Sequence, residues 1–393
     1  MTFYYRLGHI PPKRHTQFWQ PEGSLYHEEL MGMQGFQGIQ SLLYHLRPPT
    51  PIQEILAGDP AAIRLAPTPL LHHCHLRTAT VPEGGDAIAS RVPLLANRDL
   101  CLSVARPTQA MDYWYRFAPG DELIFIHSGQ GQLETQFGRL TYAAGDYLLI
   151  PAGVLWRWIP MPQVPQQMLV LQVWGHLDPP PRYRNDRGQF LEHSPYCERD
   201  LRPPEALETH DEAGSFEVRV LHGGDPTQLQ MTRYRYAHHP LDVVGWDGYL
   251  WPYTFNIADF EPITGRIHQP PPVHQTFAGP GLVVCSFVPR LLDYHPQAIP
   301  APYNHANVDS DEVLYYVSGT FLSRSGIESA SLTLHPRGLP HGPHPGRYET
   351  SVGQDRTEEY AVMMDTAQPL QMTPQAIALE DPDYSYRWRG PEP

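Results

Sequence analysis

Proline occurs 44 times in this chain of 393 residues, and glycine occupies a further 31 positions. Proline lacks the amide proton that a helix interior needs, and glycine costs extra conformational entropy when it is fixed in a helix or strand. Long helices are therefore disfavoured over most of the chain. Short apolar runs bounded by these residues predict antiparallel strands joined by turns. The sequence thus indicates a mostly β protein.

Two regions show this pattern of short strands most clearly. The first has apolar runs at residues 121–127, 133–137, 140–142 and 145–151, with glycines at the turns between them. The second extends from about residue 257 to residue 373. Between them, residues 176–206 are polar and rich in proline, which predicts a long surface excursion. Near the N-terminus, residues 26–33 predict one helical stretch.

The two regions also share an internal repeat, which indicates two related domains. In each region a glutamate is followed, after six intervening residues, by a glycine, and a Pro-x-Gly turn comes later in the same region. The spacing is similar to the two-part motif of the cupin barrel, a double-stranded β-helix. We therefore expect two cupin-like barrels, in an N-terminal domain of residues 1–255 and a C-terminal domain of residues 256–393. The repeated positions are Glu122, Gly129, Pro151 and Gly153 in the first region, and Glu312, Gly319, Pro336 and Gly338 in the second.

Candidate metal ligands occur in the second region alone. There His305, Glu312 and His341 fall on the ligand positions of the motif. Two imidazoles and one carboxylate on one face of Fe(II) leave the other positions open for substrate and O₂. Asn307 stands where a further histidine would complete a four-ligand set, so we place it beside the metal rather than on it. The alternative is that the three residues are scattered polar groups on strands.

The first region lacks these ligands. Arg116 and Ala118 stand where the histidines of the first part of the motif would be, and Trp156 replaces the histidine of the second part. The turn glycines remain. We interpret this barrel as structural, and the C-terminal barrel as the one that carries the metal site.

Four further histidines could support the site. His268 lies about one strand upstream of the candidate ligands and could act as a base or hydrogen-bond donor to a bound phenol. His274 is its rival for that role. His335 and His344 flank His341 in sequence, where they could orient the ligands from outside.

One histidine-rich segment is interpreted as structural rather than metal-binding. It reads His-His-Cys-His at residues 72–75. Neighbouring residues on a strand point to opposite faces, so we expect only His73 and His75 to converge. No second ligand pair at zinc spacing follows them.

Elsewhere, Arg337 or Arg347 could bind an anionic substrate, although each could equally be a surface arginine.

The composition excludes several classes of partner. The formal net charge is −14, which disfavours nucleic acids and anionic membranes. We find neither a run of 18 apolar residues nor an N-terminal signal core, and therefore expect no membrane association. The four cysteines follow no disulfide pattern, which predicts reduced thiols and a cytoplasmic protein.

Several segments resemble the homogentisate 1,2-dioxygenase family. The resemblance implies a non-haem Fe(II) enzyme that opens the ring of homogentisate with O₂ to give maleylacetoacetate, in the catabolism of tyrosine and phenylalanine. It also implies a homo-oligomer, a trimer or hexamer. Carried over by position, the iron ligands are His305, Glu312 and His341, the catalytic histidine is His268, and His341 also contacts the substrate. The segments that carry the resemblance are residues 25–32, 43–44, 243–256, 302–305 and 334–343.

One position departs from the family pattern. Phe321 stands where the family has a substrate-binding tyrosine, and phenylalanine has no hydroxyl to donate. This departure keeps open a ring-cleaving cupin dioxygenase for another hydroquinone-type substrate, such as gentisate or hydroquinone. A third reading is a sugar-binding or regulatory bicupin without enzymatic activity, which would consume no oxygen with any hydroquinone.

Overall fold

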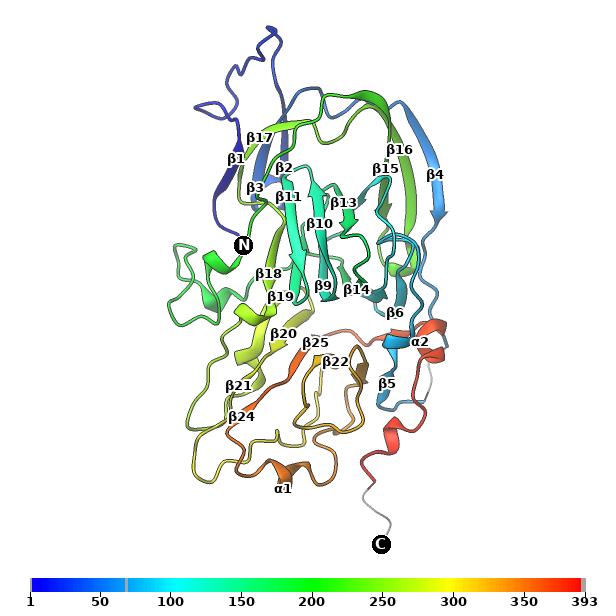
Figure 1. The fold of residues 1–393 in the computed structure, drawn as a ribbon, viewed down its shortest axis with the longest axis vertical. Coiled ribbons are helices and arrows are strands. Elements are labelled where there is room, and N and C mark those ends of the chain that lie inside the picture. Colours follow the sequence, from blue (N-terminus) through cyan, green and yellow to red (C-terminus); the bar gives the residue numbers. More distant parts are fainter. Residues whose placement is uncertain (1, 68–69, 390–393) are drawn as a thin grey trace.

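A computed structural model describes residues 2–67 and 70–389 as a mostly β protein (Figure 1). Its only α-helices in these ranges are α1 (Arg347–Ser351) and α2 (Pro374–Ala378), each a little over one turn long. This confirms that long helices are absent from the described part of the chain. None of the helices in these ranges is long and apolar enough to cross a membrane.

Two seven-stranded sheets form the body of the N-terminal part, and they include the four strands that the sequence predicted at residues 121–151. The first sheet has the order β11 (Gly138–Ala143), β10 (Gln130–Thr135), β13 (Trp156–Pro160), β8 (Trp114–Phe117), β15 (Ala213–His222), β16 (Gln230–His238) and β4 (Glu54–Pro60). The second has the order β18 (Tyr253–Asn256), β12 (Asp146–Ile150), β9 (Glu122–Ser128), β14 (Gln167–Val173), β7 (Leu100–Ala105), β6 (Val92–Ala96) and β26 (Gln371–Met372).

The C-terminal part is built on a six-stranded sheet. Its order is β19 (Gln275–Gly279), β20 (Leu282–Phe287), β25 (Tyr360–Thr366), β22 (Asp311–Ser318), β23 (Leu332–His335) and β5 (Cys74–Leu76). Long loops lie opposite this sheet, with the short pair β21 (Arg290–Leu291) and β24 (Arg356–Thr357) among them. The second barrel therefore has one regular wall and one wall made mostly of loops.

The N-terminal and C-terminal parts share one apolar core. The ring centroids of Phe125 and Tyr315, which belong to different sheets, are 6.3 Å apart. Nearby, the Tyr147 hydroxyl and Ser286 Oγ are 2.9 Å apart in a buried hydrogen bond. Each large side chain buried in this way stabilises the fold by about 1.5–3 kcal/mol. The same contacts fix the second sheet against the third.

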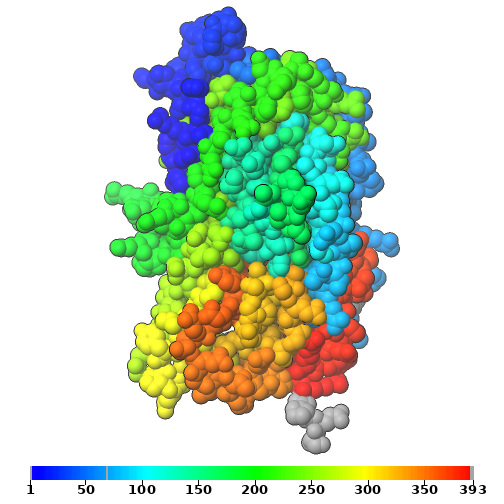
Figure 2. Space-filling view, in the orientation of Figure 1, coloured from blue at the N-terminus to red at the C-terminus, as the bar shows by residue number. Residues whose placement is uncertain are grey.

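The two parts also exchange strands. β5, from the N-terminal part of the sequence, pairs with β23 at the edge of the C-terminal sheet. β26, from near the C-terminus, pairs with β6 of the N-terminal part. Figure 2 shows the chain around residues 75–100 lying against the red C-terminal segment. The division at residue 255 stays a prediction, and strand pairing crosses it in both directions.

The helix expected at residues 26–33 is wrong. This segment contains β2 (His27–Gly32), which pairs in antiparallel register with β3 (Gln40–His45). Together with β17 (Val243–Gly248) and β1 (Tyr5–Gly8), these strands form a four-stranded sheet. An edge strand of this kind gains its hydrogen bonds from its partner, so the tertiary context overrides a weak local preference for helix.

The proline-rich segment at residues 176–206 is irregular, but it is not simply a surface excursion. Tyr183, Phe190 and Tyr196 along it are buried. The Tyr183 hydroxyl donates to the carbonyl of Gln275 at 2.7 Å, which attaches the segment to β19. Aromatic anchors therefore hold this segment across the junction between the two parts.

The repeated turn glycines adopt the conformation that the repeat requires. Gly129 and Gly319 both have positive φ, at 114° and 93°. A Cβ atom at Gly319 would lie 2.2 Å from the carbonyl oxygen of Glu358. Only glycine fits such a turn without strain.

Candidate metal centre and pocket

The three predicted ligands meet at one point. The ligand atoms of His305, Glu312 and His341 all lie within 4.8 Å of one another. Glu312 projects from β22 in the regular wall, whereas both histidines come from the loop wall opposite. The site therefore lies between the two walls of the second barrel.

A backbone pairing brings the two histidines together. The amide of His305 donates to the carbonyl of His341 at 2.8 Å, and the reciprocal bond is also 2.8 Å. Residues paired in this way present their side chains on one face, and the two ring centroids are 4.3 Å apart. Their Nδ1 atoms lie near the carbonyls of Tyr303 and Leu339, at 3.1 and 3.4 Å. The Nε2 atoms are thereby directed toward the carboxylate, at 3.5 Å from His305 and 3.2 Å from His341.

The carboxylate of Glu312 is buried and held in its ionised form. Burial alone would raise its pKa, but the imidazoles of His305, His335 and His341, which face the carboxylate, together hold the pKa well below its usual range. His335 Nδ1 lies 2.8 Å from Glu312 Oε1, and its Nε2 lies 3.0 Å from the hydroxyl of Tyr384. Burial lowers the pKa of His335 to about 3, so this imidazole is neutral near pH 7.

These residues fit a divalent metal. His341 Nε2 is buried and has no hydrogen-bond partner, although it points toward Glu312. A metal ion between the two would satisfy that nitrogen. The donor set of two imidazoles and one carboxylate is also that of non-haem iron sites. His335 then supports the carboxylate from outside, which is a common arrangement around bound metals.

Asn307 turns away from the histidines. Its Nδ2 donates to Asp365 Oδ1 at 3.1 Å, and Asp365 lies directly across from Glu312 on β25. Burial, followed by the negative charge of Glu312, raises the pKa of Asp365 to about 7. Asn307 therefore stabilises a carboxyl group next to the candidate ligand Glu312.

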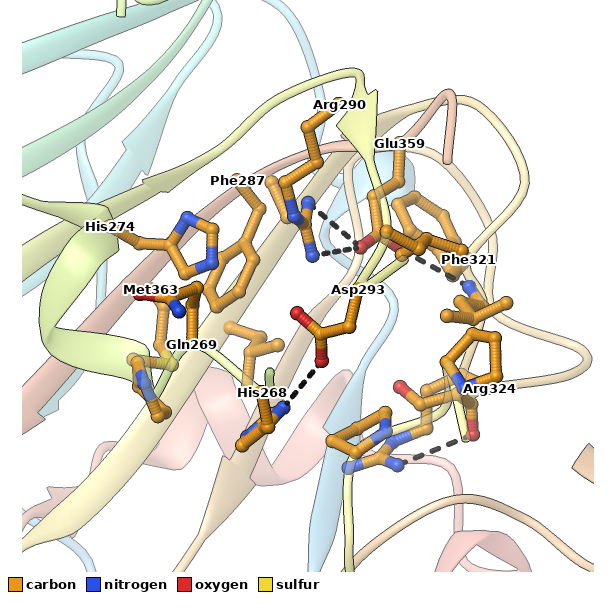
Figure 3. Close-up of a pocket in the computed structure, with 18 of the residues that line it drawn as sticks. His268, Gln269, His274, Phe287, Arg290, Asp293, Phe321, Arg324, Glu359 and Met363 are labelled. Atoms are coloured by element: carbon orange, nitrogen blue, oxygen red, sulfur yellow. Dashed lines mark hydrogen bonds and ion pairs between the residues drawn. The ribbon is translucent and has the colours of Figure 1, made fainter. Parts of the chain in front are cut away.

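A pocket of about 310 Å³ opens onto His305 and Glu312. Figure 3 shows its polar groups from one side. The pocket also contains both candidate bases, the phenylalanine that stands where the family has a tyrosine, and one arginine that the sequence did not predict as a site residue. These four residues are His268, His274, Phe321 and Arg324.

His268 and His274 differ in their surroundings. His268 Nδ1 lies 3.0 Å from Asp293 Oδ2 (Figure 3). This contact fixes the ring and its tautomer, and leaves Nε2 free for a ligand. His274 is buried against Phe287, with ring centroids 4.5 Å apart, and burial lowers its pKa to about 3. The geometry favours His268 as the base and leaves His274 as a neutral wall of the pocket.

Phe321 is buried and packs its ring edge-on against Tyr316, with centroids 4.6 Å apart. The hydroxyl of Tyr316 is itself engaged with Thr333 Oγ1 at 3.2 Å. This side of the pocket is therefore apolar at the position where the family has a tyrosine hydroxyl.

The arginines proposed from the sequence are not pocket residues. Arg337 pairs with Asp311 at 3.3 Å and donates to backbone carbonyls, and Arg347 begins helix α1 outside the pocket lining. Arg324 lines the pocket instead. A clue was available in its position, because it follows the turn glycine Gly319 on the same loop as Phe321.

The histidine-rich segment at residues 72–75 forms a different cluster from the expected one. His72 Nε2 lies 2.6 Å from Glu380 Oε1, and Cys74 completes a group with these two. His75 is buried near Asp381, and His73 packs against the ring of Trp388. The expectation that only His73 and His75 converge is wrong, because alternate residues also place His72 and Cys74 on one face.

His344, predicted to support the site, accepts a hydrogen bond at Nδ1 from the amide of Ser325, at 3.2 Å. Burial lowers its pKa to about 4. It therefore fixes the loop that carries Arg324 rather than contacting a ligand residue.

In the first barrel, an arginine lies beside the glutamate that corresponds to the candidate metal ligand. Glu122 corresponds to Glu312 in the repeat, and its Oε1 accepts a bond from Arg91 Nη1 at 2.7 Å. Its Oε2 accepts from Trp156 Nε1 at 3.1 Å. Trp156 occupies the position of His341. A buried guanidinium therefore supplies the positive charge that a metal would supply in the second barrel.

Comparisons with known proteins agree with this reading of the chain. A model of the homogentisate 1,2-dioxygenase N-terminal region matches residues 53–257, which is more than half of the chain. The chain belongs to the homogentisate 1,2-dioxygenase family. A protein of Saccharolobus solfataricus that carries the provisional name of a dioxygenase is 38% identical over 393 residues and covers 99% of both chains.

Relatives with a named substrate are more distant. Homogentisate 1,2-dioxygenase of Bradyrhizobium diazoefficiens is 26% identical over 84% of this chain and 74% of its own length. The enzyme of Emericella nidulans is 27% identical over 61% of this chain and 53% of its own. Among solved structures, a cupin 2 conserved barrel protein from Leptotrichia buccalis is 9% identical, with a TM-score of 0.32, over 71% of this chain and 88% of that chain. Family membership makes this chain a dioxygenase that uses a metal, a small-molecule substrate and O₂.

Proposed function

We propose that this dioxygenase binds Fe(II) through His305, Glu312 and His341 and opens the ring of homogentisate to give maleylacetoacetate. The observation that carries the proposal is the convergence of these three residues beside a pocket that His305, Glu312 and His268 line. Fe(II) is the metal that such a two-histidine, one-carboxylate set typically holds when it activates O₂. Both oxygen atoms of O₂ enter the product, so the reaction needs no external reductant.

The residues of the chain have separate tasks in this reaction. When bound, the metal supplies the electronic coupling between the aromatic ring and O₂. His268 accepts the proton of a substrate hydroxyl at Nε2, while Asp293 orients the ring through Nδ1 and stabilises the imidazolium that forms. The neutral side chain of His274 and the ring of Phe287 exclude water from the reacting face.

Phe321 favours a second candidate within the same reaction class. A homogentisate ring would lack the hydroxyl partner that the family tyrosine provides. A smaller hydroquinone-type substrate, such as gentisate or hydroquinone, would lose less from this change.

The test begins with anaerobic loading of the full chain with Fe(II). Oxygen consumption is then measured with homogentisate, gentisate and hydroquinone in turn. We expect uptake with at least one of the three, and the relative values of kcat/KM identify the substrate. Silence on all three contradicts the proposed function.

A ligand variant supplies the control. Glu312→Gln keeps the shape of the side chain but removes the charge that the metal needs, so we expect iron content to fall by at least about tenfold. Asp309→Asn is the matched control, since it removes an acid from the same segment without removing a proposed ligand. Normal iron binding by Glu312→Gln would rule out the carboxylate as a ligand.

The proposal extends to location and assembly. All four cysteines are free thiols, which suits a reducing cytoplasm. We also propose assembly into trimers or hexamers, as the family resemblance implies, and light scattering of the purified protein measures it directly.

A further inference from the structure

Arg324 is a buried cation without a carboxylate partner. The residue is 6% exposed, and no ion pair joins it to any acidic group within residues 2–67 and 70–389. Nη1 donates to the carbonyls of Gly342 and Ser323, and Nε is buried with no hydrogen-bond partner. A guanidinium has five N–H donors in a fixed planar array, so part of its capacity is unused. Burying such a charge is costly unless an anion completes it.

The loop that carries Arg324 is held in place from several sides. The amide of Leu322 donates to Glu359 Oε2 at 3.1 Å, and the amide of His344 donates to the carbonyl of Ser323 at 2.9 Å. On the outer side, Arg387 donates to the carbonyl of Gly326 at 2.8 Å. These contacts fix the direction of the guanidinium before any ligand binds, which lowers the entropic cost of binding.

Two contacts place Arg324 next to the metal site. It shares the carbonyl of Gly342 with Trp388, whose Nε1 donates to that oxygen at 3.0 Å. Gly342 directly follows the ligand His341 in sequence. The guanidinium carbon lies 5.5 Å from the centre of the Trp388 ring, a cation–π contact that stabilises the side chain without neutralising it.

The other charged groups of the pocket are already paired. Arg290 contacts Glu359 at 3.4 Å, and His268 contacts Asp293 at 3.0 Å (Figure 3). Glu312 is a proposed ligand of the metal. Among the described residues that line the pocket, Arg324 is therefore the cation that forms no salt bridge, although the charge of Glu312 acts on it from a distance.

We propose that Arg324 is the anion-binding group of this pocket, and that the ligand is a phenol or hydroquinone that carries a carboxylate. The inference rests on the proposed function, because that function places the hydroxyl groups of the ligand ring at His305 and Glu312. Guanidinium binds carboxylate in a two-pronged geometry that also fixes orientation. Recognition by charge would then compensate for the hydroxyl that is absent at Phe321.

Direct binding tests this inference without metal or turnover. Isothermal titration calorimetry of the metal-free full chain compares 4-hydroxyphenylacetate with 4-methylphenol, which has the same phenol but no charge. We expect the wild type to bind the carboxylate at least about tenfold more tightly. Arg324→Gln should lose most of this preference and leave the affinity for 4-methylphenol within about twofold. Arg324→Lys keeps the charge but loses the two-pronged hydrogen-bonding geometry of the guanidinium, so it should retain an intermediate preference.

Arg347→Gln is the matched control. It removes an arginine at the start of α1, outside the pocket lining, so the preference for the carboxylate should persist. Two results would overturn the inference: no preference in the wild type, or an undiminished preference in Arg324→Gln. If Arg324→Gln does not fold, Arg324→Lys decides, and a preference equal to that of the wild type overturns the inference.

The two proposals fail in different ways. Oxygen uptake with hydroquinone, combined with no preference for the carboxylate probe, would leave the dioxygenase function standing and remove Arg324 from it. A clear carboxylate preference that depends on Arg324, combined with no oxygen uptake from any hydroquinone, would retain the anion site and reject the ring-cleaving function.

Discussion

At the scale of single residues, the pocket owes its chemistry to pairs rather than to individual groups. His268 alone is an exposed loop histidine, but Asp293 fixes its ring at 3.0 Å. His274 lacks such a partner in a similar position. The difference explains why one histidine is suited to proton transfer and the other to closing the pocket.

We expect His268→Gln to lower kcat by about 10²–10⁴-fold, because it removes the proposed proton acceptor. Iron content should not change, since His268 is not a ligand. Asp293→Asn should have a smaller effect, because the base remains but loses its orientation. Steady-state oxygen uptake, with iron quantified in the same samples, checks both variants. His274→Gln is the comparison, and a larger loss of kcat there would assign the base to His274 instead.

Phe321→Tyr restores the hydroxyl that the family pattern contains. A single new hydrogen bond contributes about 0.5–1.5 kcal/mol, so KM for homogentisate should fall by roughly two- to tenfold. KM for unsubstituted hydroquinone should change less, because it has no side chain to contact the new group. The measurement is the ratio of the two KM values. An unchanged ratio would place Phe321 away from the substrate side chain.

At the scale of elements, the two barrels show how one motif is used twice. Gly129 and Gly319 both have positive φ at a turn, Glu122 is the first residue of β9, and Glu312 is the second residue of β22. The first glutamate is buried beside Arg91, whose side chain is only 9% exposed. The positive charge at this position is thus a permanent part of the fold in one barrel and a proposed metal in the other.

Arg91→Met should destabilise the protein by about 3–5 kcal/mol, because it leaves the carboxylate of Glu122 buried without its cation. The double variant Arg91→Met/Glu122→Gln should recover a large part of this loss. Urea unfolding, followed by tryptophan fluorescence, measures both. Arg98→Gln, which removes an exposed arginine, serves as control and should change the free energy of unfolding by less than about 0.5 kcal/mol. Equal stability of wild type and Arg91→Met would contradict this account of the first barrel.

The sequence was sufficient for those features that depend on local spacing. The repeat predicted the turn at Gly319 and selected Glu312 as a candidate ligand, because the two positions lie at a fixed spacing on one strand and the turn that follows it. It could not reveal Asp293, which lies 25 residues from His268 and reaches it only through the fold. Arg324 was missed for a similar reason, since many arginines occur in the chain and only burial without a partner distinguishes this one.

At the scale of the whole molecule, exchanged strands join the two parts. β5 completes the C-terminal sheet and β26 the N-terminal one, so neither sheet is complete without the other end of the chain. Such pairings could not be predicted from the sequence, because a three-residue strand such as Cys74–Leu76 is too short for a periodic pattern that would identify its partner. The sheet that carries Glu312 is therefore completed by a strand from a distant part of the sequence.

A buried charge cluster in the N-terminal sheet makes stability depend on pH. His45 on β3 contacts Asp242 at 2.6 Å and Glu29 at 3.1 Å. Burial alone would lower the pKa of His45, but the hydrogen bonds that its ring donates to the two carboxylates outweigh burial and raise the pKa to about 9. A pKa raised in the folded state means that the stabilisation is fully present below the unfolded value near 6.5, and is lost as the pH rises through about 9.

We therefore expect the free energy of unfolding to fall between pH 6.5 and pH 9.5, by at most on the order of 3 kcal/mol from this group. His45→Gln should be less stable than wild type at pH 6 and should lose less stability over the same interval. His15→Gln is the control, because His15 pairs with Glu28 while its own side chain is 95% exposed, where water screens the pair. Urea unfolding at a series of pH values measures all three proteins. Parallel pH curves for wild type and His45→Gln would show that the cluster does not set this dependence.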